Sequence, residues 1–367
     1  MAWIETRTRR KRGASKSYQV FKVYWRDPAG KVRTKTFDRK TDAQRHARTV
    51  EHRKDVGEYV DPDAGRATLT AWTEHVISTS THLRPTTRAK YEVLGRLYLA
   101  EGSLGDREIR SISKADIREF LAELTRTKNP ATVEAVFRLL HRVLEVAVEE
   151  DQLRRNPAHG VKVETSRRRE VRFLTEQEVA RIADEVPKRY RALVWTLAIS
   201  GLRIGEASAL RVGNLDLKKH TIHVIESSAE VAGRKVTGAT KSGKDRTVDI
   251  PAQLAEMLAD HLDQFGNRFA KDLFVFIGPE GGQIRQNAFR KRIFQPAAVR
   301  AGISPEPTVH ELRHTSASFM ARSGLTLLEA AGQLGHSTTT MTARYSHVFP
   351  EHRQQKMGDL GALIRSS

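Results

Sequence analysis

Two stretches poor in apolar residues divide this 367-residue chain into three segments, and each segment has a different hydrophobic pattern. The first stretch, Asp61-Pro-Asp-Ala-Gly65, has the turn chemistry that is typical of a linker. The second runs from Val161 to Arg172 and contains Arg167-Arg-Arg169, so we expect an exposed basic linker or an ordinary solvated loop there. At roughly 100–200 residues per domain, the length predicts two to three domains with cores of their own.

The first segment, residues 1–63, has the pattern of a small β-sheet followed by a helix. Residues 18–25 are rich in aromatic and β-branched side chains, Asp27-Pro-Ala-Gly30 is a turn sequence, and residues 31–37 alternate again. Two such runs on either side of a turn predict a hairpin. A helix is expected from Thr41 to about Val56, with an apolar face that consists of Ala43, Ala47 and Val50.

Positive charge is concentrated towards the two ends of the chain. Lys and Arg number 63 against 44 Asp and Glu, which gives a net charge of +19. Residues 1–60 carry +10, residues 61–160 carry zero and residues 161–367 carry +9. This surplus indicates a polyanionic partner, either nucleic acid or an anionic membrane surface. We favour a DNA-contacting sheet over a merely solvated one for the cations of the first segment, namely Lys22, Arg26, Arg33, Lys35, Arg39 and Lys40.

Composition excludes several other classes of protein. The chain has no cysteine, and therefore no disulfide framework, thiolate metal site or cysteine nucleophile. Its first residues lack the apolar core of a signal peptide, and no apolar run approaches the ~18 residues of a membrane span. We therefore expect a cytoplasmic nucleic-acid binder without a membrane partner.

Four helical patterns fill residues 66–163 and predict an all-α domain. Apolar residues recur at helical spacing around Trp72, around Tyr91, after a cap at Ser113 and after Pro130. Because this segment has no net charge, any DNA contact that it makes has to come from one face.

Residues 172–355 mix helical and strand patterns, so the chain as a whole is predicted to be a multidomain α+β protein. The last domain would be mainly α with a small antiparallel sheet, and a largely apolar helix over residues 190–200 would end at Gly201. Strands are expected at 221–225, 235–237 and 246–250. Further helices are expected at about 252–265, 286–301, 311–323, 327–334 and 338–345.

One glycine-rich segment resembles a phosphate loop but lacks two of its requirements. The segment Gly238-Ala-Thr-Lys-Ser-Gly-Lys-Asp245 ends in an aspartate where the motif needs a hydroxyl. A strand pattern follows it, whereas a phosphate loop opens a helix whose amides meet the phosphates. A nucleotide site is therefore not expected.

Five dispersed motifs together contain the groups needed to cut a phosphodiester without a metal. They are Gly201-Leu-Arg-Ile-Gly-Glu206, Thr240-Lys241, His310-Glu-Leu-Arg-His314, Leu334-Gly-His-Ser337 and Tyr345-Ser-His347. Each alone has a structural explanation, such as an ion pair between Arg203 and Glu206. Combined, they supply two guanidiniums for the transition-state charge, a tyrosine nucleophile, a lysine acid and histidine proton carriers. The scheme needs no metal and no other cofactor.

The type, order and spacing of these residues resemble those of tyrosine recombinases of the phage integrase family. By this resemblance, residues 1–63 would be an arm-type DNA-binding domain, residues 66–163 a helical core-binding domain and residues 172–355 the catalytic domain. The resemblance implies site-specific recombination of double-stranded DNA by a homotetramer, through a 3′-phosphotyrosyl intermediate and a four-way junction. Residues 356–367 would dock on a neighbouring protomer or pack as a terminal helix on their own domain.

The resemblance also implies which side chains act on the phosphate and on the leaving group. Arg203 and Arg313 would clamp the scissile phosphate, and His336 would hydrogen-bond it. Lys241 would protonate the leaving 5′-oxygen. Lys244 lies three residues away on the same hairpin tip and is the alternative lysine.

The remaining matched residues would serve the nucleophile and the architecture of the site. Tyr345 would attack the phosphorus, and His310 would take its proton. Glu206 would be a buried carboxylate that orients the Arg203 helix, and His314 and His347 would be supporting residues.

Two other functions stay open at this point: a non-catalytic DNA-binding or architectural protein, and a type IB-like topoisomerase. The charge fits the first equally well, but the complete catalytic set argues against it, and the three-part layout argues against the second. The extra basic amino-terminal domain favours a phage or mobile-element integrase over a chromosome-dimer resolving enzyme. Expected partners are core-type and arm-type DNA sites and a directionality factor, and the expected location is the nucleoid of a bacterial host.

Overall fold

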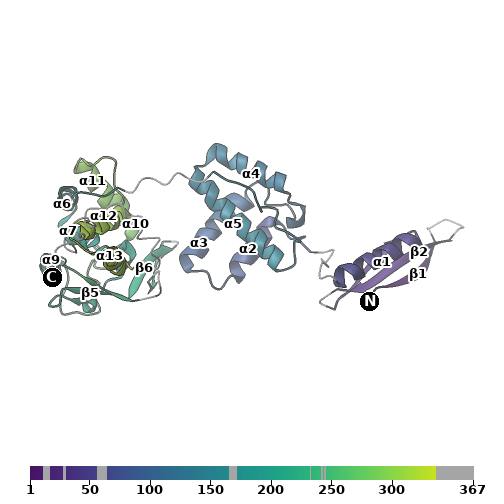
Figure 1. The fold of residues 1–367 in the computed structure, drawn as a ribbon, viewed down its shortest axis with the longest axis horizontal. Helices are drawn as coiled ribbons and strands as arrows, with labels where there is room; N and C mark the ends of the chain where they lie inside the picture. Colours follow the sequence, from purple (N-terminus) through teal and green to yellow (C-terminus); the bar gives the residue numbers. More distant parts are fainter. Residues whose placement is uncertain are drawn as a thin grey trace, which may run out of the picture. The chain divides into compact units, whose positions relative to one another are not determined.

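The computed structural model of the chain describes residues 1–10, 17–27, 30–55, 64–164, 172–231, 233–240, 243 and 245–335. Contacts group the chain into two compact units, Met1–Arg167 and Arg168–Ser367. Both units combine helices with small antiparallel sheets (Figure 1), which confirms the predicted mixture of α and β structure. In the described part of the chain, no helix is long and apolar enough to cross a membrane.

The first unit begins with a three-stranded antiparallel sheet that has one helix along it (Figure 1). The strands β1 (Trp3–Arg10), β2 (Ser17–Arg26) and β3 (Val32–Phe37) lie in this order, and α1 (Lys40–Asp55) follows. The predicted hairpin and helix are confirmed. The sequence analysis missed β1, because its charged, Arg-rich sequence has no apolar run, although it pairs with β2 along its whole length.

Alternation along β2 gives the sheet one apolar face, and α1 covers it. Val23 and Trp25 of β2 are buried together with the predicted helix face, Ala43, Ala47 and Val50. The turn between β2 and β3 is fixed by a buried carboxylate. Asp27 accepts hydrogen bonds from the Lys31 amide at 2.8 Å and from Arg33 Nε at 3.1 Å.

The rest of the first unit is helical, as predicted. Its α-helices are α2 (Leu69–Thr79), α3 (Pro85–Leu94), α4 (Lys114–Thr127) and α5 (Pro130–Glu149), and a π-helical segment, Gly95–Ala100, continues α3. The predicted cap is present, since Ser113 and Asp116 form a capping box at the start of α4. The Trp72 indole Nε1 donates to the Val143 carbonyl at 3.0 Å, which joins α2 to the central helix α5.

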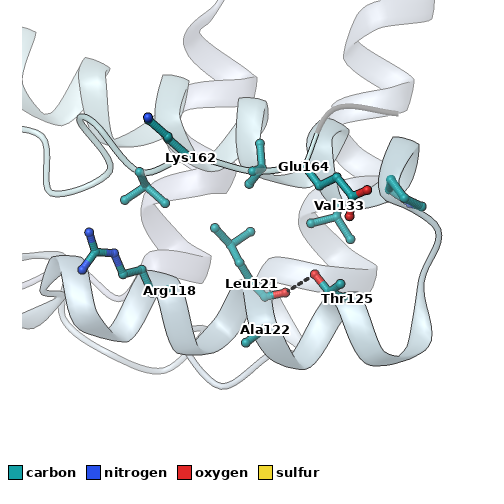
Figure 2. A pocket seen from close by; sticks show the side chains of 10 residues that line it. Arg118, Leu121, Ala122, Thr125, Val133, Lys162 and Glu164 are labelled. Atoms are coloured by element: carbon teal, nitrogen blue, oxygen red, sulfur yellow. Dashed lines mark hydrogen bonds between the residues drawn. The ribbon is translucent and has the colours of Figure 1, made fainter. Parts of the chain in front are cut away.

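A small cavity of about 190 Å³ lies in this helical part, where residues 161–164 run beside α4 and α5 (Figure 2). Apolar side chains such as Leu121 and Val133 line it, and Figure 2 shows Arg118 and Lys162 together at one end. None of the predicted catalytic residues is part of the lining. This cavity is therefore a packing gap between residues 161–164 and the two helices, and it is not the predicted catalytic site.

The second unit contains most of the predicted helices of the last domain. They are α6 (Glu176–Glu185), α7 (Lys188–Ser200), α8 (Ile204–Ala209), α9 (Ala252–Phe265), α10 (Gln286–Ala288), α11 (Gln295–Arg300), α12 (Val309–Arg322) and α13 (Leu327–Leu334). The helix predicted over 286–301 is α10, a π-helical segment at Phe289–Phe294, and α11. The helix predicted over 338–345 lies outside the described residues.

The strands of the second unit form two small sheets instead of the single predicted one. One sheet has the order β4 (Leu215–Asp216), β5 (Thr221–Val224) and β8 (Arg246–Asp249). The other is a two-stranded ribbon of β6 (Glu226–Val231) and β7 (Arg234–Ala239). The prediction of one sheet was wrong because β6, with the sequence Glu-Ser-Ser-Ala-Glu-Val, lacks a strand-like apolar alternation and was missed.

Candidate active site

The structure describes about half of the predicted catalytic set. Arg203, His310 and Arg313 are described, as are the supporting residues Glu206 and His314. Outside the described residues lie Lys241, its alternative Lys244, His336, Tyr345, His347 and the predicted docking segment 356–367. The part of the predicted site that the structure describes is therefore the part that contains the two arginines.

Arg203 stands at the start of α8, two residues after the glycine that ends α7. Gly201 has a φ of +66°, in the left-handed region that glycine adopts without steric cost. A Cβ at this position would lie 2.4 Å from Leu334 Cδ2 and 2.9 Å from Ser316 Oγ. The turn that precedes Arg203 is thus packed directly against α12 and α13, and a larger residue has no room there.

Glu206 is a buried carboxylate, 2 % exposed, that accepts hydrogen bonds from two arginines. Its Oε1 accepts from Nη1 of Arg203 at 2.8 Å and from Nη1 of Arg246 at 3.0 Å. Its Oε2 accepts from the Arg203 backbone N–H at 2.9 Å and from Nη2 of Arg246 at 2.8 Å. The ion pair between Arg203 and Glu206 suggested by their spacing is present, and Arg246 adds a second pair that the sequence analysis missed.

These contacts determine the ionisation of Glu206. Burial alone would raise the pKa of its carboxyl group. The hydrogen bonds and charge of Arg246, together with those of Arg203, outweigh burial and lower the pKa to about 2. At neutral pH, one carboxylate therefore lies between two guanidiniums, and the cluster keeps one net positive charge.

This shift predicts that part of the stability of the second unit depends on pH. The folded-state pKa lies below the ordinary value of 4.5, so the ionised group stabilises the fold above about pH 4.5 and loses this effect as the pH falls towards 2. The contribution is about 3 kcal/mol by linkage. Urea unfolding of Glu206→Gln, followed by tryptophan fluorescence between pH 7 and 3, should show a correspondingly weaker pH dependence than the wild type. Parallel pH profiles for the two proteins would contradict the assignment.

Arg313 lies on α12, whose first turn is closed by a capping box of Thr308 and Glu311. Its side chain is buried, with 3 % of the residue exposed. Nη1 donates to the Gly201 carbonyl at 2.6 Å, and Nη2 donates to the Leu334 carbonyl. One guanidinium thus joins the turn before Arg203 to the end of α13, two residues before His336.

His310 and His314 occupy successive turns of α12 near Arg313. Their rings meet edge to face, with centroids 4.7 Å apart and an interplanar angle of 80°. The His310 residue is exposed and His314 is half-buried. The helix therefore presents an imidazole at the surface and a guanidinium in the interior at the position of the predicted His-x-x-Arg motif.

The predicted lysine belongs to the connection between β7 and β8. β7 ends at Ala239, the next residue Thr240 is fully buried, and β8 begins at Arg246. The Gly243 amide donates to the Thr240 carbonyl at 3.0 Å. In the sequence, the segment with Lys241 and Lys244 therefore lies between buried Thr240 and Arg246, which pairs with Glu206. Across the described ranges, no group of three or more His, Asp or Glu side chains could hold a metal ion.

The cations of the first segment that were predicted to contact DNA do not all lie on one face of its sheet. By strand register, Lys22 lies on the face away from α1, and so does Arg26, whose Nη1 donates to the Gly30 carbonyl at 3.2 Å. Arg33 pairs across from buried Trp25 and makes the ion pair with Asp27, so it belongs to the turn. Two further predicted cations, Arg39 and Lys40, lie at the start of α1, and Lys35 lies over the Phe37 ring at 5.5 Å.

The open face of the sheet also carries residues that the sequence analysis missed with β1. Trp3 stacks on Tyr24 with ring centroids 5.3 Å apart and planes 6° apart. Register places Arg7 and Arg9 on the same face as Lys22, with Glu5 directly opposite Lys22. The available signal was the alternation of Ile4, Thr6 and Thr8 with the charged residues Glu5, Arg7 and Arg9.

Comparison with known proteins places this arrangement in a family. Residues 172–352 match the profile of the phage integrase family. The chain is 29% identical to the putative prophage phiRv2 integrase of Mycobacterium tuberculosis, across 93% of this chain and 92% of that protein. It is 27% identical to a XerC-like tyrosine recombinase of Caldanaerobacter subterraneus subsp. tengcongensis, across 95% and 96%.

Two solved structures have a similar fold. The Tn1549 transposon integrase in complex with transposon right end DNA matches with a TM-score of 0.68 at 19% identity, over 80% of this chain and 100% of that one. A lambda integrase tetramer bound to a Holliday junction matches with a TM-score of 0.61 at 19% identity, over 87% and 94%. At 19% identity, these two likenesses show that the chain shares the fold of solved integrase structures. The chain belongs to the phage integrase family, and it is a tyrosine recombinase.

Proposed function

We propose that this protein is the integrase of a phage or other mobile element, which cuts and rejoins DNA at specific sites through a phosphotyrosine. One observation carries the proposal. In a chain of this family, the Arg313 guanidinium is hydrogen-bonded to the Gly201 carbonyl, two residues before Arg203. The two arginines of the predicted clamp thus come from distant parts of the sequence and meet around one turn.

The chemistry assigned to these side chains balances without a metal or ATP. The Tyr345 hydroxyl attacks the scissile phosphorus, and His310 accepts its proton. Arg203 and Arg313 stabilise the added charge on the non-bridging oxygens.

The remaining steps of this proposed reaction break the phosphodiester and later restore it. His336 hydrogen-bonds the phosphate, and Lys241 donates a proton to the leaving 5′-oxygen. The products are a 3′-phosphotyrosyl enzyme and a free 5′-hydroxyl. Because the ester conserves the bond, attack by a 5′-hydroxyl from a second duplex completes strand exchange.

Trapping on a nicked suicide substrate tests this function. Duplexes from the DNA that flanks the gene are nicked just beyond the candidate cutting point, so that the short cleaved strand diffuses away and rejoining fails. The wild-type protein should then form an adduct that survives denaturation, and peptide mass spectrometry should locate the nucleotide on Tyr345. Specific binding without an adduct would support the architectural protein instead. Relaxation of plasmids that lack any specific site would support a topoisomerase.

We further propose that residues 1–63 are a separate module that binds arm-type sites through the open face of the β1–β2–β3 sheet. This face combines the Trp3–Tyr24 stack with Arg9 and Lys22, a mixture suited to phosphates and base edges. Its opposite face is covered by α1. Among the predicted cations, Lys22 and Arg26 fit this role, whereas Arg33 is engaged with Asp27.

A pair of charge-matched double variants tests the sheet face. Arg9→Ala with Lys22→Ala should weaken arm-site binding and reduce the slope of log affinity against log salt by about two. Arg45→Ala with Arg48→Ala removes the same charge from the exposed side of α1 and should leave that slope nearly unchanged. Filter binding at several salt concentrations measures both. Equal losses in the two double variants would mean that the module attracts DNA by its net charge alone.

The partners and the location of the protein are further proposals that rest on its proposed function as an integrase. We infer a homotetramer on core-type DNA, residues 66–163 as the core-binding domain and residues 172–355 as the catalytic domain. The lambda integrase tetramer on a Holliday junction supports the assembly by its similar fold. A directionality factor and the nucleoid of a bacterial host complete the proposal, and residues 356–367 are assigned to docking between protomers.

A further inference from the structure

We propose that Arg246 is a positioning residue that keeps the guanidinium of Arg203 available to the scissile phosphate. The inference rests on the proposed function, and it assigns a role to a residue that does not itself touch the phosphate. Arg246 starts β8, and its side chain is 10 % exposed. Its side chain donates a hydrogen bond to the carboxylate of Glu206, which precedes it by 40 residues in the sequence and also pairs with Arg203.

Arg246 makes a stronger contact with the Glu206 carboxylate than Arg203 does. Arg246 donates to both carboxylate oxygens, through Nη1 at 3.0 Å and Nη2 at 2.8 Å, which is a bidentate fork. Arg203 contributes a backbone N–H and a single side-chain nitrogen, Nη1. Four donors share the two oxygens, and the stronger, two-pronged contact belongs to Arg246.

The guanidiniums of Arg203 and Arg246 compete for that carboxylate. A guanidinium and a buried carboxylate favour a fork because both oxygens are then paired. Without Arg246, Arg203 is the cation that remains to form this fork with Glu206. It would then turn more of its donors towards the protein, and the net charge of the cluster would fall from +1 to zero. Arg246 therefore maintains both the orientation and the positive field of Arg203.

The end of α13 holds the Arg246 side chain in the position from which it pairs with Glu206. Its Nε donates to the Gln333 carbonyl near the end of α13, at 3.0 Å. Gly335 follows with a φ of +64°, and a Cβ there would lie 2.9 Å from Arg246 Cδ. This close approach and the hydrogen bond to Gln333 fix the guanidinium of Arg246 against the end of α13.

Single-turnover cleavage of the suicide substrate tests the role of Arg246. We expect Arg246→Ala to lower the cleavage rate by roughly 10²-fold while core-site binding stays unchanged, because small misplacements of a catalytic group have effects of this size. Arg246→Lys keeps the charge and one prong, so its rate should lie between those of the wild type and Arg246→Ala. If the alanine variant fails to fold, the lysine variant still gives the rate.

The matched control is Arg189→Ala. Arg189 is also a half-buried arginine of the second unit, and its Nη1 donates to the Gly278 carbonyl at 2.7 Å. Its removal perturbs packing without touching Glu206 and should leave the cleavage rate of folded, DNA-bound protein near that of the wild type.

Two combinations separate positioning from general damage to the fold. In an Arg203→Ala background, adding Arg246→Ala should cost less than about 2-fold, because the residue through which Arg246 acts is already gone. Adding Glu206→Gln to Arg246→Ala should raise the rate above that of the single variant, since a neutral amide no longer captures Arg203. A merely structural residue would show additive losses and no rescue.

The outcomes also distinguish this inference from the proposed function. A wild-type protein that forms no adduct overturns both. A wild-type adduct with unimpaired cleavage by Arg246→Ala, or with fully additive losses in the Arg203→Ala background, overturns the role of Arg246 alone.

Discussion

Tyr345→Phe is expected to abolish the covalent adduct with the suicide substrate and to leave binding of core-site DNA unchanged. The substitution removes one oxygen, the proposed nucleophile, and keeps the aromatic ring. In the proposed mechanism the attacking oxygen has to be in line with the leaving 5′-oxygen, and phenylalanine has no oxygen to place there. The loss should therefore be complete within detection, and not a graded decrease in rate.

The proposed mechanism requires that the Tyr345 hydroxyl become reactive at neutral pH. A free phenol has a pKa of about 10, so attack needs a base or a strong positive field. The Arg203–Glu206–Arg246 cluster keeps one net positive charge, and the buried Arg313 guanidinium adds another. Together with His310 as the proton acceptor, these charges would lower the cost of forming the phenolate near the phosphate.

A second tyrosine in the same unit gives the matched control for this experiment. Tyr190 is buried on α7 and packs against Phe289 with ring centroids 5.6 Å apart. Tyr190→Phe also removes a phenolic oxygen and should still form the adduct. Gel electrophoresis after denaturation compares the two variants with the wild type. An adduct formed by Tyr345→Phe would remove that residue from the mechanism and reopen the search for the nucleophile.

Local patterns predicted the helices of this protein well, because helix signals lie within a few neighbouring residues. The limits of α9 and α13 match the predicted 252–265 and 327–334 at both ends. The cap at Ser113 was readable for the same reason. In contrast, β1 and β6 were missed, since a polar strand is recognisable mainly through the partner with which it pairs.

The candidate site shows the same division between local and distant signals. Arg203 and Arg313 stood in motifs of distinct residue types, and the resemblance to a family assigned their roles. Arg246 carried no such signal, because its partner Glu206 is 40 residues away and its β8 sequence resembles an ordinary edge strand. Its contact with Glu206 becomes visible only when the fold brings the two residues together.

Arg313→Ala is expected to lower the cleavage rate by roughly 10²-fold or more, the usual effect of removing one donor to a developing oxyanion. Arg313 differs from an exposed phosphate-binding residue because its guanidinium also holds the carbonyls of Gly201 and Leu334. Truncation leaves both carbonyls without this donor and should destabilise the second unit, at about 1–3 kcal/mol for each unsatisfied group. The rate therefore has to be measured on folded, DNA-bound protein, with thermal unfolding recorded in parallel.

Two further variants separate the catalytic loss from the structural one. Arg313→Lys keeps the positive charge, but an ammonium cannot present two parallel donors to carbonyls on different elements, so stability should fall and the rate should stay well below that of the wild type. Arg322→Ala removes an arginine from the last turn of the same helix, where the side chain is exposed and lies over the Phe319 ring at 5.0 Å. Its cleavage rate should equal that of the wild type. If Arg313→Ala, once corrected for its folded fraction, cleaves as fast as Arg322→Ala, then Arg313 is a structural tie between α7 and α13, and Arg203 remains as the guanidinium on the phosphate.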